Sequence, residues 1–372
     1  MSIGQDSLYC ASDRQWIDTI QHVPHDVYHT PAYHLIPGFG SEGDAYVFVH
    51  RETDKVFLWP YLLTPIDGGS DSCDVTSVYG YAGPISHPDQ AFVQRAWLAL
   101  CDHWRMQKVV SAFTRFHPIL GNSELMTSIP DDESPSQATG LKLCGATISI
   151  NLNKSPEEQV KGYQKVLRQE IRKSRELGFV TIEDSDWKHV DDFVRLYRDT
   201  MSRRKGRSEY LIDSDWVAKF RGLLGGQARL FVTKWDGVVA AALLAMQHEP
   251  FLHAHLTGIE AELVAYSPLK VLLDQVREWG NTHGFQFFHL GGGLGGREDS
   301  LYHFKRRFSP QTHEFHTGSW ILNPAQYKAL EEAHKRNYRE QGLDIGNPGY
   351  FPIYRYQPEM PEREACPEIS VL

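Results

Sequence analysis

Residues 291–310 read Gly291-Gly292-Gly293-Leu294-Gly295-Gly296-Arg297-Glu298-Asp299-Ser300-Leu301-Tyr302-His303-Phe304-Lys305-Arg306-Arg307-Phe308-Ser309-Pro310, a glycine cluster followed by a short charged helix. The aromatic residues just before it, 285–290, predict a buried strand that runs straight into the glycines. Glycine tolerates positive φ and lets the backbone approach a ligand closely, so a glycine cluster at a strand end is typical of a site rim. Asp299 or Ser300 is a suitable N-cap for the helical turn, and Pro310 ends it.

The helical turn carries three successive cations, Lys305, Arg306 and Arg307, flanked by two phenylalanines. Aromatic anchors on both sides hold at least one cation in a fixed direction, which a site for a developing negative charge requires. The alternative is a glycine-rich turn followed by a solvated basic helix, and the local pattern leaves both interpretations open. The glycines also have the spacing of a dinucleotide fingerprint, but too little patterned chain follows them for a dinucleotide-binding fold.

Composition limits the class of protein. A chain of 372 residues suits two domains, and an apolar fraction of 41% is enough to form real cores. The net charge of −9 gives no global positive field, so any nucleic-acid contact must come from a local basic patch. The five cysteines are scattered and form no C-x-x-C pair, as in reduced proteins. No signal peptide is evident, and the clearest apolar run, 238–246, is far shorter than the ~20 residues of a membrane span. We therefore expect a cytoplasmic protein.

Hydrophobic periodicity and turn residues predict the same order of elements in both halves of the chain. The first half predicts helices at 13–22 and 87–106, strands at 44–51, 55–63, 75–84, 109–116 and 147–152, and a loop at 122–140. The second half predicts helices at 157–177, 186–201, 213–224, 267–282 and 324–339, and strands at 228–235, 238–247, 251–258, 285–290 and 312–321. We therefore predict a mixed α/β (α+β) protein made of two tandem copies of one small unit, 1–153 and 154–345, with a tail or strap at 346–372.

Three local features carry chemical information. Alternation along the predicted strand 75–84 puts Tyr79 and Tyr81 on one face, where they line a pocket or pack on the sheet. The helix 157–177 carries a basic run that could track phosphates, although a solvated helix face explains it equally well. The loop 202–210 adds a second group of cations.

Histidine chemistry is less specific. His253 and His255 alternate along a strand and project to one side, as metal ligands would, but no third ligand stands at a suitable spacing. We therefore predict no metal and place both histidines in a polar cleft. The chain has neither a Gly-x-Ser-x-Gly elbow nor a Walker loop, so serine nucleophiles and phosphoryl transfer from ATP are unsupported.

Four motifs occur in a recognisable order. They are Leu167-Arg168-Gln169-Glu170-Ile171-Arg172-Lys173, Phe193-Val194-Arg195-Leu196-Tyr197, Ser267-Pro268-Leu269, and the glycine cluster with Phe304-Lys305-Arg306-Arg307-Phe308. This order resembles the Fem family of aminoacyl-tRNA-dependent peptidyltransferases. The resemblance covers most of 157–320, with a looser match at Tyr79-Gly80-Tyr81-Ala82-Gly83-Pro84, and the lysine between two phenylalanines is its most specific element.

The resemblance implies two tandem GNAT-like domains and a reaction in which an acceptor amine attacks the aminoacyl ester at the tRNA 3′ end. Lys305 matches the family lysine that steadies the tetrahedral oxyanion or the departing ribose oxygen. We expect the substrates to contact Tyr79, Tyr81, Arg204, Arg207, Tyr210, His253, His255 and Asp299. We expect the tRNA to contact Arg168, Arg172, Lys173 and Arg306. No cofactor is implied. His253 and His255 are candidates for the base that takes the amine proton, as are groups of the substrates themselves.

Several alternatives stay open. Residues 32–37 lack the basic residue that cell-wall members of the family carry, and the second half has no room for their helical hairpin, so a small peptide or amino-acid acceptor stands beside a cell-wall precursor. An acyl-CoA donor would need a Gln/Arg-x-x-Gly-x-Gly/Ala loop that opens a helix. Gln137, Arg175 and Arg277 begin that pattern and none completes it, which favours tRNA as the donor. A non-catalytic binding protein on a transferase scaffold is the remaining alternative.

Overall fold

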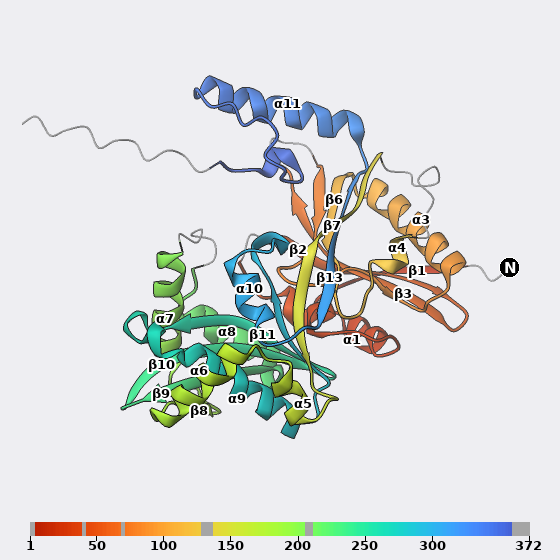
Figure 1. The fold of residues 1–372 in the computed structure, drawn as a ribbon. Helices are drawn as coiled ribbons and strands as arrows, with labels where there is room; N and C mark the ends of the chain where they lie inside the picture. Colours follow the sequence, from red (N-terminus) through yellow and green to blue (C-terminus); the bar gives the residue numbers. More distant parts are fainter. Residues whose placement is uncertain (1–3, 39–41, 68–70, 128–136, 205–210, 359–372) are drawn as a thin grey trace, which may run out of the picture.

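One continuous β-sheet forms the frame of the molecule (Figure 1). The computed structural model describes residues 4–38, 42–67, 71–127, 137–204 and 211–358. The strands described there form a 13-stranded sheet in the order β1-β2-β3-β4-β6-β13-β7-β12-β11-β10-β9-β8, with β5 paired to β3. Helices cover the sheet, which gives the mixed α/β fold predicted from the sequence.

The strand bounds follow the predicted pattern closely in the second half, where β9 and β13 begin and end at the predicted residues. The strands are β1 (Gln5–Cys10), β2 (Asp44–Glu52), β3 (Lys55–Pro65), β4 (Cys73–Thr76), β5 (Ile85–Ser86), β6 (Val109–Arg115), β7 (Gln137–Asn151), β8 (Val180–Glu183), β9 (Ala228–Trp235), β10 (Val238–His248), β11 (Phe251–Ile259), β12 (Phe287–Gly292) and β13 (Thr312–Ile321).

The helices lie mainly where the apolar periodicity predicts them. The α-helices are α1 (Arg14–Ile20), α2 (Pro31–His34), α3 (Gln90–Met106), α4 (Glu124–Thr127), α5 (Pro156–Lys161), α6 (Lys165–Glu176), α7 (Val190–Arg203), α8 (Ser214–Leu224), α9 (Pro268–Thr282), α10 (Ser300–Arg306) and α11 (Pro324–Glu340). Short 3₁₀ turns are η1 (Val27–His29), η3 (Gly225–Gln227), η4 (Ala261–Tyr266), η5 (Leu294–Gly296) and η6 (Ile353–Arg355).

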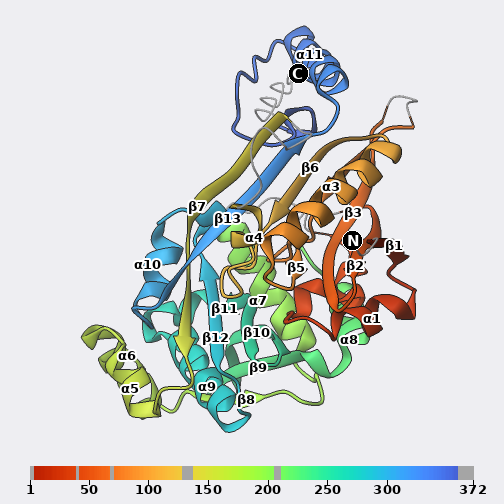
Figure 2. The same cartoon turned by 90° about the vertical axis from the view of Figure 1, so that its right-hand side faces the viewer.

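The last strand joins the two halves of the chain. β13 lies between β6 and β7 and pairs antiparallel with both, so that Gly318 stands opposite Thr114 on one side and Leu141 on the other. Figures 1 and 2 show β7 and β13 side by side along the middle of the molecule. β7 also pairs with β12, which makes the sheet continuous. The domain boundary near residue 153 stays a prediction.

The predicted strand over 75–84 is wrong beyond Thr76. β4 ends there, and Tyr79 and Tyr81 lie in an irregular segment instead of alternating along a strand. Gly80 has φ +115° and Gly83 has φ +77°, which are left-handed conformations that interrupt a strand. A Cβ on Gly80 would lie 2.3 Å from the Tyr28 ring, so the close approach requires glycine.

The predicted long helix over 157–177 is broken in two. α5 ends at Lys161 and α6 begins at Lys165. The Gln164 N–H donates to the Arg307 carbonyl at 2.9 Å, and a Cβ on Gly162 would lie 3.3 Å from Pro310. Contacts with the segment after α10 therefore replace the helical hydrogen bonds at this point. The prediction also missed α4 and the first part of β7, because it treated 122–140 as one loop.

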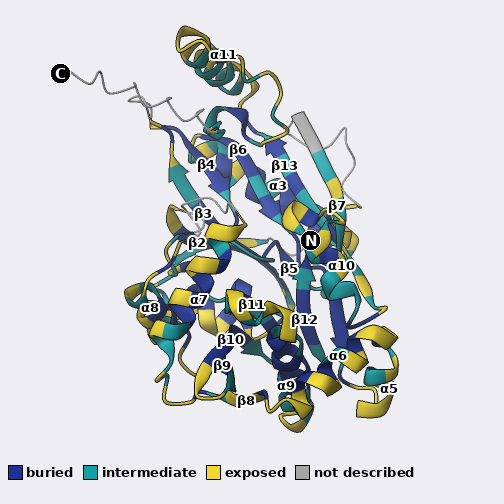
Figure 3. Cartoon of the chain, turned by 60° about the vertical axis from the view of Figure 1, so that its left-hand side comes forward, coloured by how far each residue is buried: buried dark blue, intermediate teal, exposed yellow. Residues whose placement is uncertain are grey.

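Burial follows the sheet (Figure 3). In the first half, α3 packs on β3 through tryptophans, with the tilted rings of Trp97 and Trp59 5.5 Å apart. In the second half, α9 and α6 pack over β10, β12 and β7. By contrast, α11 buries no residue and stands at one end of the molecule, while Arg355 after it returns to Asp74 at 2.6 Å. Within the described residues, no helix combines the length and apolar character that crossing a membrane requires.

Candidate active site

Two parallel strands part at the centre of the sheet. β11 and β12 pair only where 251–253 run beside 287–289, yet β11 continues to Ile259 and β12 to Gly292. His253 and His289 therefore form the last paired rung before the strands diverge. Parted strands leave backbone groups unpaired and open a wedge in the sheet, which is a suitable place for a ligand.

Lys305 reaches the end of β12 from α10. Asp299 caps that helix, since its carboxylate accepts the Tyr302 N–H at 2.9 Å and the Leu294 N–H at 2.8 Å. The Lys305 Nζ donates to the Gly292 carbonyl at 2.7 Å. A Cβ on Gly291 would lie 3.2 Å from that Nζ and 3.6 Å from the Tyr81 hydroxyl, so both groups converge over bare backbone.

Burial shifts the pKa values of both Lys305 and Tyr81 at the end of β12. Burial lowers the pKa of Lys305 to about 8, with Asp299 opposing the shift and the Arg204 charge adding to it. Lys305 and Tyr81 are nevertheless partly exposed, so a substrate can reach both. Burial raises the pKa of Tyr81, which keeps its proton and stays a hydrogen-bond donor. An ammonium and a neutral hydroxyl thus face one point, as stabilising an oxyanion requires.

Tyrosines from the first half line the parted strands. The ring of Tyr28 lies 5.1 Å from His253, and the ring of Tyr81 lies 5.1 Å from His289. Tyr79 lies 6.1 Å from His255, which stacks on the Phe220 ring at 5.5 Å. Burial lowers the pKa of His255 to about 3, so this imidazole is neutral. The wall is therefore aromatic and uncharged beside the cationic corner.

A buried carboxylate next to the tyrosines connects the two halves. The Asp26 Oδ2 atom lies 2.8 Å from His117 Nε2 and 2.7 Å from His253 Nε2, and His253 Nδ1 lies 3.2 Å from His289 Nδ1. These four side chains are at most 1% exposed. Burial alone would raise the pKa of Asp26, but attraction to His253 and hydrogen bonds from both histidines hold it well below its usual range. Asp26 is therefore ionised inside the protein.

The donor atoms of Asp26, His117 and His253 lie within 4.8 Å of one another, close enough to surround a metal ion. The hydrogen bonds favour a different interpretation. The Leu120 N–H donates to His117 Nδ1 at 3.0 Å, so a neutral His117 carries its proton on Nε2 and donates it to Asp26. A metal ligand at Nε2 needs that nitrogen free and Nδ1 protonated. The cluster therefore fits a hydrogen-bond network better than a metal centre.

Comparison with known proteins concerns the fold. A family model for the acetyltransferase (GNAT) domain matches residues 161–306. No curated protein sequence matches the chain. Among solved structures, the crystal structure of FemX is similar with 13% sequence identity and a TM-score of 0.67, covering 87% of this chain and 99% of that one. The fold is that of FemX. The Fem-like fold predicted from the sequence motifs is thereby confirmed.

Two further solved structures are similar over much of the chain. One is the C-terminal domain of a putative lysylphosphatidylglycerol synthetase from Agrobacterium fabrum, with 16% identity, a TM-score of 0.48, and coverage of 76% of this chain and 86% of that one. The other is a tandem GNAT protein from the clavulanic acid biosynthesis pathway, with 10% identity, a TM-score of 0.47, and coverage of 87% and 99%.

The FemX-like fold brings together most of the residues that the sequence singled out. Tyr79, Tyr81, His253, His255, Lys305, Asp299 and Arg204 gather around the parted strands. Both carboxylate oxygens of Asp299 accept hydrogen bonds from backbone N–H groups. Asp299 therefore holds the glycine turn against α10. Arg207 and Tyr210 lie outside the described residues, and nothing about their position follows from the structure.

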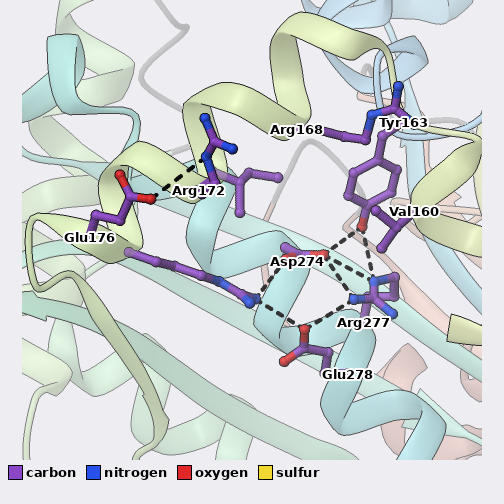
Figure 4. A pocket seen from close by; sticks show the side chains of 10 residues that line it. Val160, Tyr163, Arg168, Arg172, Glu176, Asp274, Arg277 and Glu278 are labelled. Atoms are coloured by element: carbon purple, nitrogen blue, oxygen red, sulfur yellow. Dashed lines mark hydrogen bonds and ion pairs between the residues drawn. The ribbon is translucent and has the colours of Figure 1, made fainter. Parts of the chain in front are cut away.

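The predicted tRNA contacts lie on α6 and α10. Arg168, Arg172 and Lys173 are exposed on α6, and Arg306 donates to the Ser309 carbonyl at 2.7 Å. A cavity of about 490 Å³ lies between α6 and α9. Figure 4 shows Arg168 and Arg172 among the side chains that line it. Its floor is a closed network in which buried Arg277 donates to Asp274 and Tyr163. Lys305 does not line it, so this cavity is separate from the parted strands.

Sequence reasoning missed Asp26, His117 and His289 as site residues. Asp26 stands 227 residues before His253 and 91 before His117, so no local spacing connects them. His289 was seen only as part of a predicted strand. The one available signal was that a histidine stands two residues before the glycine cluster in the same strand.

Proposed function

We propose that this protein is an aminoacyltransferase that moves an amino acid from aminoacyl-tRNA to the amine of a peptide or amino-acid-like acceptor. One observation carries the proposal. The Lys305 ammonium is held over the bare backbone of Gly291 and Gly292, beside the Tyr81 hydroxyl, where two parallel strands part. The resemblance to the Fem family, whose most specific element is this lysine, supports the same chemistry.

The reaction forms one bond and breaks one. The acceptor nitrogen attacks the ester carbonyl, a tetrahedral oxyanion develops, and the bond to the ribose oxygen then breaks. A fixed ammonium and a neutral phenol can stabilise that oxyanion or donate to the departing oxygen, which is typically worth 10²–10³-fold in rate for one donor. Lys305 and Tyr81 are suited to these roles because both are rigidly placed and partly exposed.

Basic side chains on α6, the helix that contacts the end of α10, support a tRNA donor. The exposed cations of α6 include the three predicted tRNA contacts, Arg168, Arg172 and Lys173. α6 lies against the end of α10, because Gln164 N–H donates to the Arg307 carbonyl and Arg307 forms an ion pair with Glu170. A phosphate backbone on this face would bring its 3′ end toward the helix that carries Lys305.

The acceptor would then bind beside Tyr79 and Tyr81, on the side of the parted strands formed by the first half of the chain. Tyr79, Tyr81 and His255 form an aromatic, neutral wall, and Arg204 supplies a positive charge close to Lys305. Such a combination suits a small acceptor with an amine at one end and a carboxylate at the other. A peptide or amino acid meets both requirements.

An acyl-CoA donor is the second candidate, and the match of 161–306 to a GNAT acetyltransferase domain favours it. Such a donor needs backbone amides free to cradle a pyrophosphate at the helix that follows the central strand. Here the turn between β11 and α9 carries Glu260 and Glu262, and α9 begins with Pro268, which has no N–H. In the second half of the molecule, the two glutamates at this turn would repel a pyrophosphate, so the turn favours aminoacyl-tRNA over acyl-CoA as the donor.

Label transfer tests the donor directly. The protein is incubated with a mixed pool of radiolabelled aminoacyl-tRNAs, or with labelled acyl-CoA, and an amine-rich small-molecule extract. The proposal predicts RNase-sensitive transfer of label from tRNA into an amide that survives mild alkali. Transfer from acyl-CoA alone would contradict the assigned donor while leaving an acyltransferase. A protein that binds both donors and transfers from neither would overturn the proposal of catalysis.

A further inference from the structure

The proposed reaction needs a group that takes a proton from the amine, and this inference rests on that proposed function. An amine that attacks an ester becomes positively charged and must lose a proton before the amide is stable. Lys305 is mostly protonated at neutral pH, because its pKa is about 8, and Tyr81 keeps its own proton. Neither Lys305 nor Tyr81 is therefore suited to take this proton, and other side chains near them are candidates for the base.

The buried network fixes where its protons lie. His117 donates its Nε2 proton to Asp26, because its Nδ1 accepts the Leu120 N–H. The other oxygen of Asp26 accepts the Val27 N–H at 2.6 Å. An ionised carboxylate can only accept, so His253 also presents an Nε2 proton to Asp26 Oδ2. A neutral His253 then has a lone pair on Nδ1.

That lone pair faces His289. The two Nδ1 atoms are 3.2 Å apart, so a neutral His253 accepts the Nδ1 proton of His289. The Nε2 atom of His289 then carries a lone pair, and it has no hydrogen-bond partner in the described part of the chain. Asp26, His253 and His289 thus form a chain of donors and acceptors that begins on a carboxylate and ends on an unoccupied base.

An unpartnered buried nitrogen is not by itself a site, because among the described residues His34 and His103 have one as well. Position distinguishes His289. It belongs to the last rung before β11 and β12 part, and its ring contacts Tyr81 at 5.1 Å. The charges of His253, His117, His313 and Lys305 also act on it, and burial together with them lowers its pKa.

His289 and the point that Lys305 faces lie on the same strand. The ladder with β7 shifts register between His289 and Gly291, so Leu290 is the extra residue and points into the core. Gly291 has no side chain, and the direction its Cβ would take is toward the Lys305 Nζ and the Tyr81 hydroxyl. No side chain of β12 therefore separates His289 from the point where the oxyanion would form.

We propose that His289 is the general base of the transfer, with His253 and Asp26 as positioning residues that receive the proton. The amine N–H proton moves to His289 Nε2 as the carbon–nitrogen bond forms, and the His289 Nδ1 proton moves to His253 Nδ1. His253 becomes an imidazolium against the Asp26 carboxylate. The ester bond breaks as the ribose oxygen takes a proton from Lys305. After the products leave, His253 returns its Nδ1 proton to His289 Nδ1, the Nε2 proton of His289 passes to solvent, and Lys305 is reprotonated.

The first test is the protonation of His289 in the protein alone, without any donor. Long-range ¹H–¹⁵N spectra of the full chain report which imidazole nitrogens carry protons, and His289→Asn assigns the signal. We expect a proton on Nδ1 and none on Nε2 at the pH of activity. A proton on His289 Nε2 throughout the active pH range would overturn the inference, whichever donor the enzyme uses.

The second test uses kinetics with the donor that wild type accepts, so a wrong donor assignment stays distinguishable from a wrong base. His289→Asn keeps an N–H for His253 but has no base, and should lower kcat roughly 10²–10³-fold and remove the acidic limb of its pH profile. Asp26→Asn should move that limb to lower pH. His103→Asn, at a half-buried histidine of α3 whose Nε2 also has no partner in the described part of the chain, is the matched control. An unchanged kcat and acidic limb in His289→Asn would overturn the inference.

Discussion

Lys305 combines two opposing properties. Burial lowers its pKa to about 8, while stabilising an oxyanion needs its charged form. At neutral pH a lysine with this pKa is still mostly protonated. Above pH 8 the charge is lost, although an ordinary lysine keeps it to about pH 10. The environment that makes the cation effective therefore also limits the pH range in which it exists.

The pH profile of Lys305→Arg follows from this. Wild-type kcat/KM should fall as pH rises through about 8, because the ammonium loses its proton there. Arginine keeps its charge beyond pH 12, so the variant should be slower but should lose that falling limb. Initial rates between pH 6 and pH 10 measure this. A wild-type rate that instead rises through pH 8 would mean that the neutral amine of Lys305 is the active form.

The irregular segment after β4 is held in shape by glycine. In Gly80→Ala, the added Cβ would lie 2.3 Å from the Tyr28 ring, at a φ of +115° that alanine avoids. We expect a loss of unfolding free energy of about 2 kcal/mol, measured by urea denaturation. Gly222→Ala in α8 is the control, because a Cβ there meets nothing within 4 Å and alanine favours helix. Equal stability of the two variants would contradict the packing described here.

The exposed face of α6 should bind phosphates. Replacing Arg168, Arg172 and Lys173 by alanine should weaken tRNA binding and lower the slope of log K against log salt by roughly 2, if each side chain contacts a phosphate. Filter binding at several salt concentrations gives the slope. The control replaces Lys328, Arg336 and Arg339 of α11, which are exposed at the opposite end of the molecule (Figure 1). An equal loss in both variants would indicate a general charge effect.

Local patterns predicted elements well where local forces decide them. β9 and β13 begin and end as their alternation and turn residues predict, and Asp299 caps α10 as its position suggests. The break between α5 and α6 could not be predicted, since a contact with Arg307 causes it. The candidate site could be predicted only in part, because local sequence patterns reveal some of its residues and long-range contacts bring in the others. Lys305 stands in a motif, whereas Asp26 meets His253 only through the folded sheet.

At the scale of the whole molecule, the C-terminal strand completes the core of the first half. Trp320 of β13 is 4% exposed and packs on Trp97 and Trp59, with ring centroids 5.0 and 5.6 Å apart. Trp320→Ala should cost about 3–5 kcal/mol of unfolding free energy. Met106→Ala, which removes a side chain 77% exposed on α3, should change little. A cost below about 1 kcal/mol in Trp320→Ala would mean that the first half is stable without β13.

The same strand explains why the site forms only in the complete fold. Asp26, His117 and the tyrosines come from the first half, while His253, His289 and Lys305 come from the second. β7 and β13 connect the two sets of strands through the middle of the sheet. The whole fold is therefore needed to position the candidate site around Lys305 at the end of β12.

Single-turnover amide formation from aminoacyl-tRNA, compared between wild type, Lys305→Ala and Lys219→Ala, tests the central claim most directly. Lys219 is an exposed lysine of α8 and serves as the control. We predict that Lys305→Ala binds the tRNA with nearly unchanged affinity but reacts roughly 10²–10³-fold more slowly, while Lys219→Ala reacts at the wild-type rate. A Lys305→Ala variant that turns over at the wild-type rate would contradict the account.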